Sequence, residues 1–380
     1  MRKIVLILSL VFVGVMGVSF VARWDGGEYW KETQTRKGAD LYQHYAAGRM
    51  VREGKTELLY RDSHLLRWIQ KGEAPKYHFN YVYSPLIAKI AACFAGEHYI
   101  RFYIGWLIFS LACVIASIYF LKHIAPDIKF LPVYILGFPS TAYSLILGQL
   151  TPLSLLLVSI AGFAFKRNHA FAAGFFLSCL CYKPQLLPFL ALILALMGWW
   201  KVFGGMMLGG LIWLGATILA GGWNLFIDWA NVLLGMGAGI GQSQNWSLNI
   251  TWLGFFWNFG WKLNAFLWLG TAMVPLALIA VWIRLKNLPK PEALFGNLTF
   301  CLPFLPYALS YELLLTTPAF LLFIKNTLPS KGLWLLSVLW WFLALWSHQP
   351  INNTFTFIAP VITLLWIACL LKVNDPDTHL

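Results

Sequence analysis

The sequence has few charged residues. Only 11% of its 380 residues are Asp, Glu, Lys or Arg, and 59% are hydrophobic. A soluble domain has roughly 25% charged residues. This composition is typical of a protein embedded in a membrane, and it excludes a sizeable soluble catalytic domain because apolar runs occupy most of the length.

The sequence also lacks the short motifs that mark common enzyme classes. It has no Walker motif, GxGxxG, HExxH or GxSxG. Its six cysteines lie in apolar segments without metal-ligand spacing, so we interpret them as buried small side chains. We therefore expect no metal and no cofactor, and any substrate must carry its own energy.

The net charge of +13 has two interpretations. In a soluble protein it favours nucleic acid as the partner. In a membrane protein it more often reflects cytoplasmic loops rich in Lys and Arg. We expect membrane lipids and no nucleic acid.

About a dozen apolar runs are long enough to cross, or nearly cross, a hydrocarbon core of about 30 Å. They lie at residues 4–22, 99–121, 130–147, 150–165, 169–182, 185–200, 202–220, 263–283, 292–309, 312–325, 331–347 and 351–371. The sequence thus predicts an all-α polytopic membrane protein with about 12 transmembrane helices, forming a single membrane domain over residues 1–380.

The distribution of basic residues predicts the orientation. Met1-Arg2-Lys3 precedes an apolar run with no cleavage signal, which indicates an uncleaved first helix that begins in the cytoplasm. From there, Lys and Arg fall in alternate short loops, and the opposite short loops contain only Lys183. We expect a multi-pass protein of the cell (inner) membrane, with both termini cytoplasmic.

Residues 23–98 are predicted to form an extracytoplasmic (periplasmic) loop. Residues 40–53 have the pattern of an interfacial amphipathic helix, with Asp40 as its N-cap and Gly54 as its C-cap, and residues 61–71 predict a second. Residues 81–95 are apolar but short, with Lys89 in the middle, so we interpret them as a re-entrant or interfacial helix.

Asp40 is the main candidate for catalysis. A cap role is common for Asp. A carboxylate at the membrane–water boundary is also suited to take a proton from an attacking sugar hydroxyl as a general base.

Lys183 and Glu312 are charged residues at outer helix ends. A charge at membrane depth is costly and tends to be functional. Lys183 is suited to pair with a lipid phosphate, or else it snorkels to the head groups. Glu312 is either a second carboxylate facing the same cavity or a helix-start residue that favours the helix dipole.

Other outer-side residues are candidates for substrate contacts, although each has a structural alternative. Gln149 and Asn245 are suited to sugar hydroxyls or to helix capping. Lys89 and Arg101 are suited to a carrier phosphate or to ordinary anionic lipids. The outer histidines, which lack metal spacing, are His44, His78 and His348.

Four local patterns resemble glycosyltransferase family 87, the polyprenol-phosphate-dependent hexosyltransferases of GT-C fold. They are Gly38-Ala39-Asp40-Leu41-Tyr42 with Ala46-Ala47-Gly48; Tyr83-Ser84-Pro85-Leu86; Gly148-Gln149-Leu150-Thr151-Pro152 with Lys183-Pro184; and Tyr311-Glu312-Leu313. Ser84 stands where the family usually has Pro, and Glu312 where it has Asp or His.

The resemblance implies a function. It implies that Asp40 is the catalytic base, that Tyr42 and Tyr83 belong to the substrate site, and that the donor is a polyprenyl-phosphate sugar, most often mannose. Transfer to a lipid or glycan acceptor would invert the anomeric carbon. The competing hypotheses are a transporter or flippase of a lipid-linked sugar, for which we see no paired halves, and a ligase or scaffold subunit.

Overall fold

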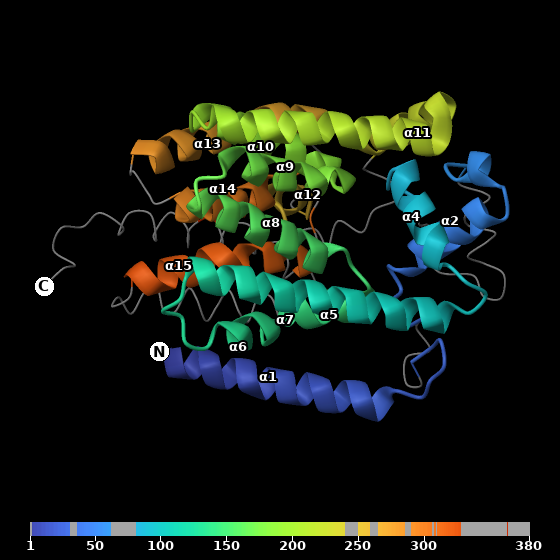
Figure 1. Ribbon diagram of the computed structural model, residues 1–380, viewed down its shortest axis with the longest axis horizontal. Coiled ribbons are helices and arrows are strands. Elements are labelled where there is room, and N and C mark those ends of the chain that lie inside the picture. The colour runs from blue at the N-terminus through green and yellow to red at the C-terminus, as the bar shows by residue number, and fades with distance from the viewer. Residues whose placement is uncertain are drawn as a thin grey trace, which may run out of the picture.

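The computed structural model describes residues 2–30, 36–61, 81–239, 250–258, 265–285, 290–305, 308, 310–327 and 363. These residues form helices and short 3-10 turns without any β-strand, apart from one isolated bridge between Tyr29 and Arg36. The all-helical prediction is therefore confirmed for this part of the chain. The long helices run along a common axis (Figure 1).

The helices follow one another with short connections. They are α1 (Arg2–Arg23), α2 (Tyr42–Arg52), α4 (Pro85–Phe94), α5 (Tyr99–Ile124), α6 (Leu131–Leu136), α7 (Pro139–Leu147), α8 (Thr151–Lys166), α9 (Ala170–Ser178), α10 (Leu187–Leu196), α11 (Trp200–Gly239), α12 (Trp252–Asn258), α13 (Ala265–Leu285), α14 (Lys290–Phe304) and α15 (Thr317–Thr327). The 3-10 turns are η1 (Thr56–Leu58), η2 (Cys179–Tyr182), η3 (Pro184–Leu186) and η5 (Ser310–Thr316).

Three helices of the described chain are long and apolar enough to cross a membrane. They contain the segments Leu6–Arg23, Tyr99–Ile124 and Trp200–Leu234. The first two agree with the runs predicted at 4–22 and 99–121, and α8 agrees closely with the run at 150–165. The predicted runs at 331–347 and 351–371 lie outside the described residues, so the count of about 12 stays a prediction.

One predicted run is wrong, and two others are right in extent but differ in detail. The single helix expected at 130–147 is two helices, α6 and α7, because Pro139 begins a new helix after Gly137 and Phe138. The run at 169–182 ends as the 3-10 turn η2. The run at 202–220 continues as α11 to Gly239, across a kink at Gly222 where the backbone φ is 78°.

Helix α14 lies in the core. Every residue from Pro291 to Phe304 except Glu292 is buried, which is typical of a helix surrounded by others. It packs against α8, α10, α13 and α15. By contrast, α1 leaves residues such as Val18 and Val21 exposed, 71% and 72% respectively, as expected for a helix whose outer side faces lipid.

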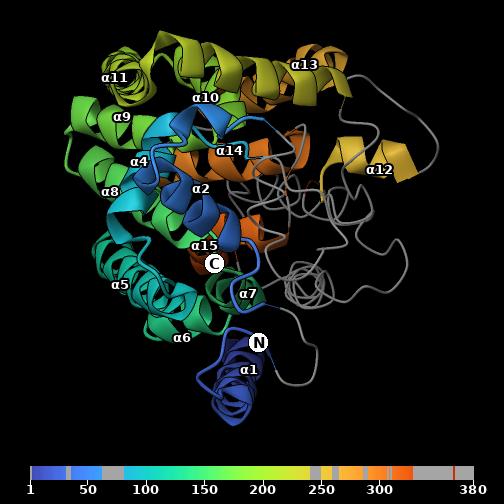
Figure 2. The ribbon, with the colours of Figure 1, turned by 90° about the vertical axis from the view of Figure 1, so that its right-hand side faces the viewer.

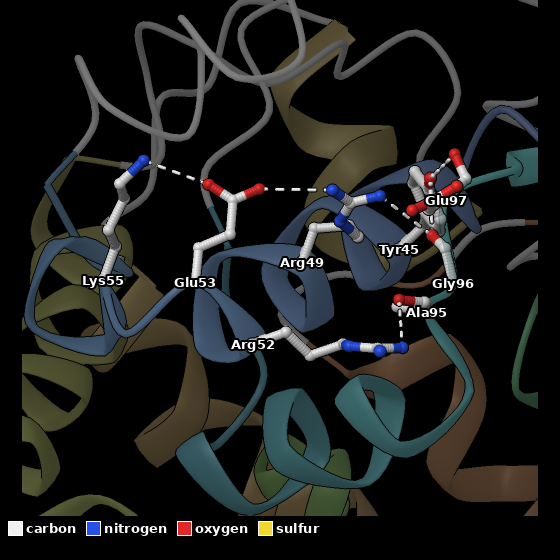
Figure 3. A network of polar contacts seen from close by, with 8 residues as sticks. All are labelled: Tyr45, Arg49, Arg52, Glu53, Lys55, Ala95, Gly96 and Glu97. Carbon is white, nitrogen blue, oxygen red and sulfur yellow. Dashed lines mark hydrogen bonds and ion pairs between the residues drawn. The ribbon is translucent and has the colours of Figure 1, made fainter.

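Helices α2 and α4 pack together at one end of the bundle, as the end-on view shows (Figures 1 and 2). With 10 residues, α4 is roughly 15 Å long, about half of the hydrocarbon core. Arg49 and Arg52 of α2 donate to the carbonyls of Gly96 and Ala95 just beyond α4 (Figure 3). These bonds satisfy the carbonyls that a helix end leaves free.

The predicted caps of α2 differ in outcome. Gly54 ends the helix as expected, because its N–H donates to Val51 and that of Lys55 to Met50 in a Schellman pair. The prediction that Asp40 is the N-cap is wrong: Leu41 occupies that position and no side chain caps the helix. The carboxylate of Asp40 is used elsewhere. The second predicted helix, 61–71, lies outside the described residues apart from Arg61.

Basic residues gather at the opposite end of the bundle, where α1 begins and α5 and α8 end (Figure 1). Lys166 donates to the carbonyls of His123 and Ile124, which end α5. Arg284 donates to the carbonyl of Leu196, and Lys290 to the side chain of Asn168. Lys166 and Arg284 lie in the last turns of their helices, where the helix end carries partial negative charge.

Candidate active site

Two glycine-containing segments meet at the α2 end of the bundle. The N–H of Gly38 donates to the carbonyl of Ile146, and the N–H of Leu41 donates to the carbonyl of Leu147. The donor–acceptor distance is 3.2 Å in both bonds. Gly38 and Gly148 have positive φ of 60° and 74°. A Cβ on Gly148 would lie 2.4 Å from that of Leu41, so only glycine permits this approach.

The side chain of Asp40 is held by this junction. The Nε2 atom of Gln149 donates a short hydrogen bond to Oδ2 of Asp40, across 109 residues of sequence. Burial raises the pKa of Asp40 from 3.8 to about 6, and the bond from Gln149 opposes that rise. The carboxylate of Asp40 is therefore mainly ionised at neutral pH, and its pKa is close enough to neutral pH for it to accept a proton.

Tyr83 and His44 lie beside this pair. Burial raises the pKa of the Tyr83 hydroxyl, and the negative charges of Asp40 and Glu312 raise it further, so Tyr83 lies near both carboxylates. The ring of His44 packs on the ring of Tyr83 with 4.4 Å between centroids. Burial lowers the pKa of His44 to about 3, so its imidazole is neutral.

Lys183 and Glu312 form a buried ion pair. The Nζ atom of Lys183 lies 2.8 Å from Oε1 of Glu312, and both residues are 5% exposed. Helices α7 and α8 pack against η5, which carries Glu312. The two residues that the sequence treated as separate candidates are thus direct partners.

Tyr182 lies next to Lys183 in the chain and contacts the residue that follows Gln149. Its hydroxyl contacts the hydroxyl of Ser154 and the carbonyl of Leu150, the residue after Gln149. Lys183 follows Tyr182 directly, so the hairpin of α8 and α9 brings the Gln149 turn and Lys183 to the same region. No sequence pattern predicts a role for Tyr182 or Ser154, and the available signal is the Tyr-Lys-Pro run between two helices.

The remaining candidates have other surroundings or lie outside the described residues. Lys89 and Arg101 are exposed on α4 and at the start of α5. The ring of Tyr42 lies under the guanidinium of Arg36, 3.7 Å from its carbon. Asn245, His78 and His348 lie outside the described residues. Within the described ranges, no group of His, Cys, Asp or Glu is arranged to hold a metal.

The fold and the site define a helical membrane protein with a buried carboxylate at one end of its bundle. The sequence profile of glycosyltransferase family 87 matches residues 81–306, more than half of the chain. The chain belongs to glycosyltransferase family 87, as the resemblance predicted, and is a membrane glycosyltransferase. The match includes Tyr83, Gln149 and Lys183; Asp40 lies before it and Glu312 after it. No curated protein and no solved structure matches the chain significantly.

Proposed function

We propose that this glycosyltransferase, of GT-C fold, moves a hexose, most often mannose in such enzymes, from a polyprenyl-phosphate donor to a lipid or glycan acceptor. The observation that carries the proposal is the carboxylate of Asp40, positioned by Gln149 and with a pKa raised to about 6. A group with this pKa is a suitable general base near neutral pH.

The proposed reaction is a single displacement. Asp40 takes the proton from the acceptor hydroxyl while the oxygen of that hydroxyl forms a bond to the anomeric carbon of the donor. The bond from that carbon to the phosphate oxygen breaks on the opposite face, which gives inversion, and the polyprenyl phosphate leaves with the bonding electrons. The donor supplies the energy, so the proposal requires neither a nucleotide nor a metal.

The phosphate of the donor needs a cationic contact. We propose Lys183, which its bond to Glu312 holds in place, with the exposed Lys89 and Arg101 on the approach from the lipid. Because Glu312 neutralises Lys183, an approaching phosphate must compete with a carboxylate. Substitutions of Lys183 and of Lys89 or Arg101 can test the two proposed phosphate contacts separately.

The test of the reaction is transfer of label. Membranes containing the protein are incubated with radiolabelled polyprenyl-phosphate mannose, and the label is expected in a new covalent product with an inverted linkage, read by NMR. Membranes without the protein are the control. Label that crosses the bilayer still attached to its original lipid would instead establish the transporter alternative, and retention of configuration would exclude the displacement.

We also propose that the site lies on the extracytoplasmic side. The cation-rich end of the bundle and the Asp40 end are opposite one another (Figure 1), and short cytoplasmic loops are enriched in Lys and Arg. In a variant without the six native cysteines, a membrane-impermeant thiol reagent is expected to label Thr35→Cys in intact cells but not Asn168→Cys. The reverse pattern would place Asp40 in the cytoplasm.

A further inference from the structure

Four buried polar atoms near the α2 end have no hydrogen-bond partner among the described residues. They are Nδ1 of His44, the hydroxyls of Tyr81 and Ser84, and Nε1 of Trp106. His44, Tyr81 and Ser84 are 3%, 2% and 0% exposed. Folded proteins pair the large majority of such atoms, because an unpaired buried group loses water without gaining a partner. Several in one place therefore indicate a ligand.

The aromatic members surround His44. The centroid of its ring lies 6.0 Å from that of Tyr81 and 6.1 Å from that of Trp106. The ring of Tyr83 is closer still at 4.4 Å, and His44 itself lies in the first turn of α2, which directly follows the segment of Asp40. The unpaired atoms therefore lie close to the proposed base. They come from α2 (His44), α5 (Trp106) and the segment before α4 (Tyr81 and Ser84).

Ser84 supplies an independent observation. It is the N-cap residue of α4, where a serine hydroxyl normally accepts a bond from an N–H of the first turn, yet its side chain makes no such bond. Because the residue is fully buried, solvent does not replace the missing contact. The helix leaves this hydroxyl to another partner.

The chemistry of the four groups restricts that partner. Burial keeps His44 neutral, so its ring has one donor nitrogen and one acceptor nitrogen. Each of the two hydroxyls can donate and accept a hydrogen bond, and the indole N–H of Trp106 can only donate. None of the four carries a charge, which disfavours phosphate. A neutral molecule rich in hydroxyl groups, with C–H faces to lie on aromatic rings, fits this set.

We propose that His44, Tyr81, Ser84 and Trp106 form a subsite for the ring hydroxyls of a hexose beside Asp40. The proposal rests on the proposed transferase function, because the hexose belongs either to the donor or to the sugar acceptor. The two sources present the same chemistry, and kinetics with each substrate varied separately distinguishes them.

The test uses Tyr81→Phe, which removes only the hydroxyl, and Trp106→Phe, which removes the indole N–H together with part of the ring. Tyr81→Phe and Trp106→Phe are each expected to raise the KM of one substrate about tenfold, as for a lost hydrogen bond. The melting temperature of Tyr81→Phe is expected to stay equal or rise, because the protein itself makes no bond with that hydroxyl. Trp106→Phe is expected to melt lower because the smaller ring leaves a cavity, so its KM is the deciding measurement. A purely structural role predicts lower melting temperatures and unchanged KM.

Tyr45→Phe is the matched control. The hydroxyl of Tyr45, also on the α2 side, donates to the carbonyls of Gly96 and Glu97 (Figure 3). Its removal is expected to lower the melting temperature and leave both KM values unchanged. If Tyr81→Phe and Trp106→Phe behave as Tyr45→Phe does, the subsite does not exist.

A direct binding measurement separates this inference from the transfer reaction. Saturation-transfer NMR with methyl α-mannoside and methyl α-galactoside is expected to show ring protons in contact with the wild type and a loss of signal in His44→Phe. Binding without any transfer would retain the subsite and reject the enzyme. Transfer without sugar contacts, or equal contacts in both proteins, would reject the subsite.

Discussion

At the end of the bundle where α1 begins, Lys166, Arg284 and Lys290 lie near the surface and donate to backbone carbonyls or to Asn168. At the other end, Asp40 is held by Gln149, and Lys183 and Glu312 are buried against each other. The first arrangement uses cations where solvent and helix dipoles favour them. The second takes charge out of water, which is costly unless each group has a partner.

The difference separates charges that solvent favours from charges that burial makes costly. Each of the surface cations at the end where α1 begins contributes little to folding. The charges buried at the other end have a desolvation cost, and the carboxylate of Asp40 has a neutral partner, Gln149, among the described residues. Such a carboxylate has the environment that tunes a pKa toward neutrality.

The largest expected effect is on catalysis. Asp40→Asn keeps the shape of the side chain and an oxygen for Gln149 but removes the base, so turnover is expected to fall about 10²–10⁴-fold, measured as label transferred per minute. Glu53→Gln, at an exposed carboxylate paired with Arg49 and Lys55, is expected to retain wild-type turnover. More than about a tenth of wild-type activity in Asp40→Asn would reject the base.

The sign of the stability effect of Asp40 follows from its pKa. The folded state holds the proton more tightly than the unfolded chain, so the carboxylate costs stability as the pH rises from 3.8 through about 6. Asp40→Asn should therefore melt at the same or a higher temperature than the wild type above this window. A marked fall in melting temperature would mean that the loss of activity reflects misfolding.

The second effect is on stability. Lys183→Ala leaves Glu312 buried without its cation and is expected to cost about 3–5 kcal/mol of unfolding free energy. Arg284→Ala, at the opposite end, should cost below about 1 kcal/mol. Denaturant titration in detergent measures both.

The double variant Lys183→Met with Glu312→Gln separates stability from substrate binding. Removal of both charges is expected to restore most of the stability. If Lys183 also contacts the donor phosphate, the KM of the donor stays about ten- to a hundredfold higher in the restored protein. A wild-type KM there would assign Lys183 to the fold alone.

A smaller effect is expected at the junction that positions Asp40. Gly148→Ala places a side chain at φ 74° and against Leu41, which costs about 1–2 kcal/mol for the left-handed backbone and displaces the Asp40 segment. The fold-loss of activity should exceed what unfolding of part of the protein would explain at this loss of stability. Gly105→Ala, in α5 with open space around it, should change neither, and equal behaviour of the two variants would contradict the junction.

The smallest expected effect is a shift in pH dependence. The bond from Gln149 lowers the pKa of Asp40, so Gln149→Leu should raise that pKa above about 6. The acidic limb of kcat/KM, where Asp40 loses its proton, then moves to higher pH. Gln43→Leu is the control, because Gln43 donates to the backbone carbonyl of Asp40 and not to its carboxylate. If the acidic limb of kcat/KM stays at the same pH in Gln149→Leu, that limb reports the titration of a group other than Asp40.

The accuracy of the sequence-based prediction differed with the type of feature. The helices α1, α5 and α8 were predicted to within a few residues because a long apolar run must bury its backbone polar groups in its own hydrogen bonds. The break at Pro139 was missed, since the flanking residues are equally apolar and composition outweighed the local signal. Asp40 was assigned a cap by local spacing, and the structure gives its carboxylate a partner 109 residues away.

The sequence by itself determined the class of protein, the places of its main helices and the separation of cationic loops from the candidate site. These features depend on composition and on neighbours a few residues apart. Only the tertiary structure decided that Asp40 meets Gln149, that Lys183 meets Glu312, and that His44, Tyr81 and Trp106 come together. The physical reason is that a polar side chain gains most from whichever partner burial brings to it, and packing between distant helices selects that partner.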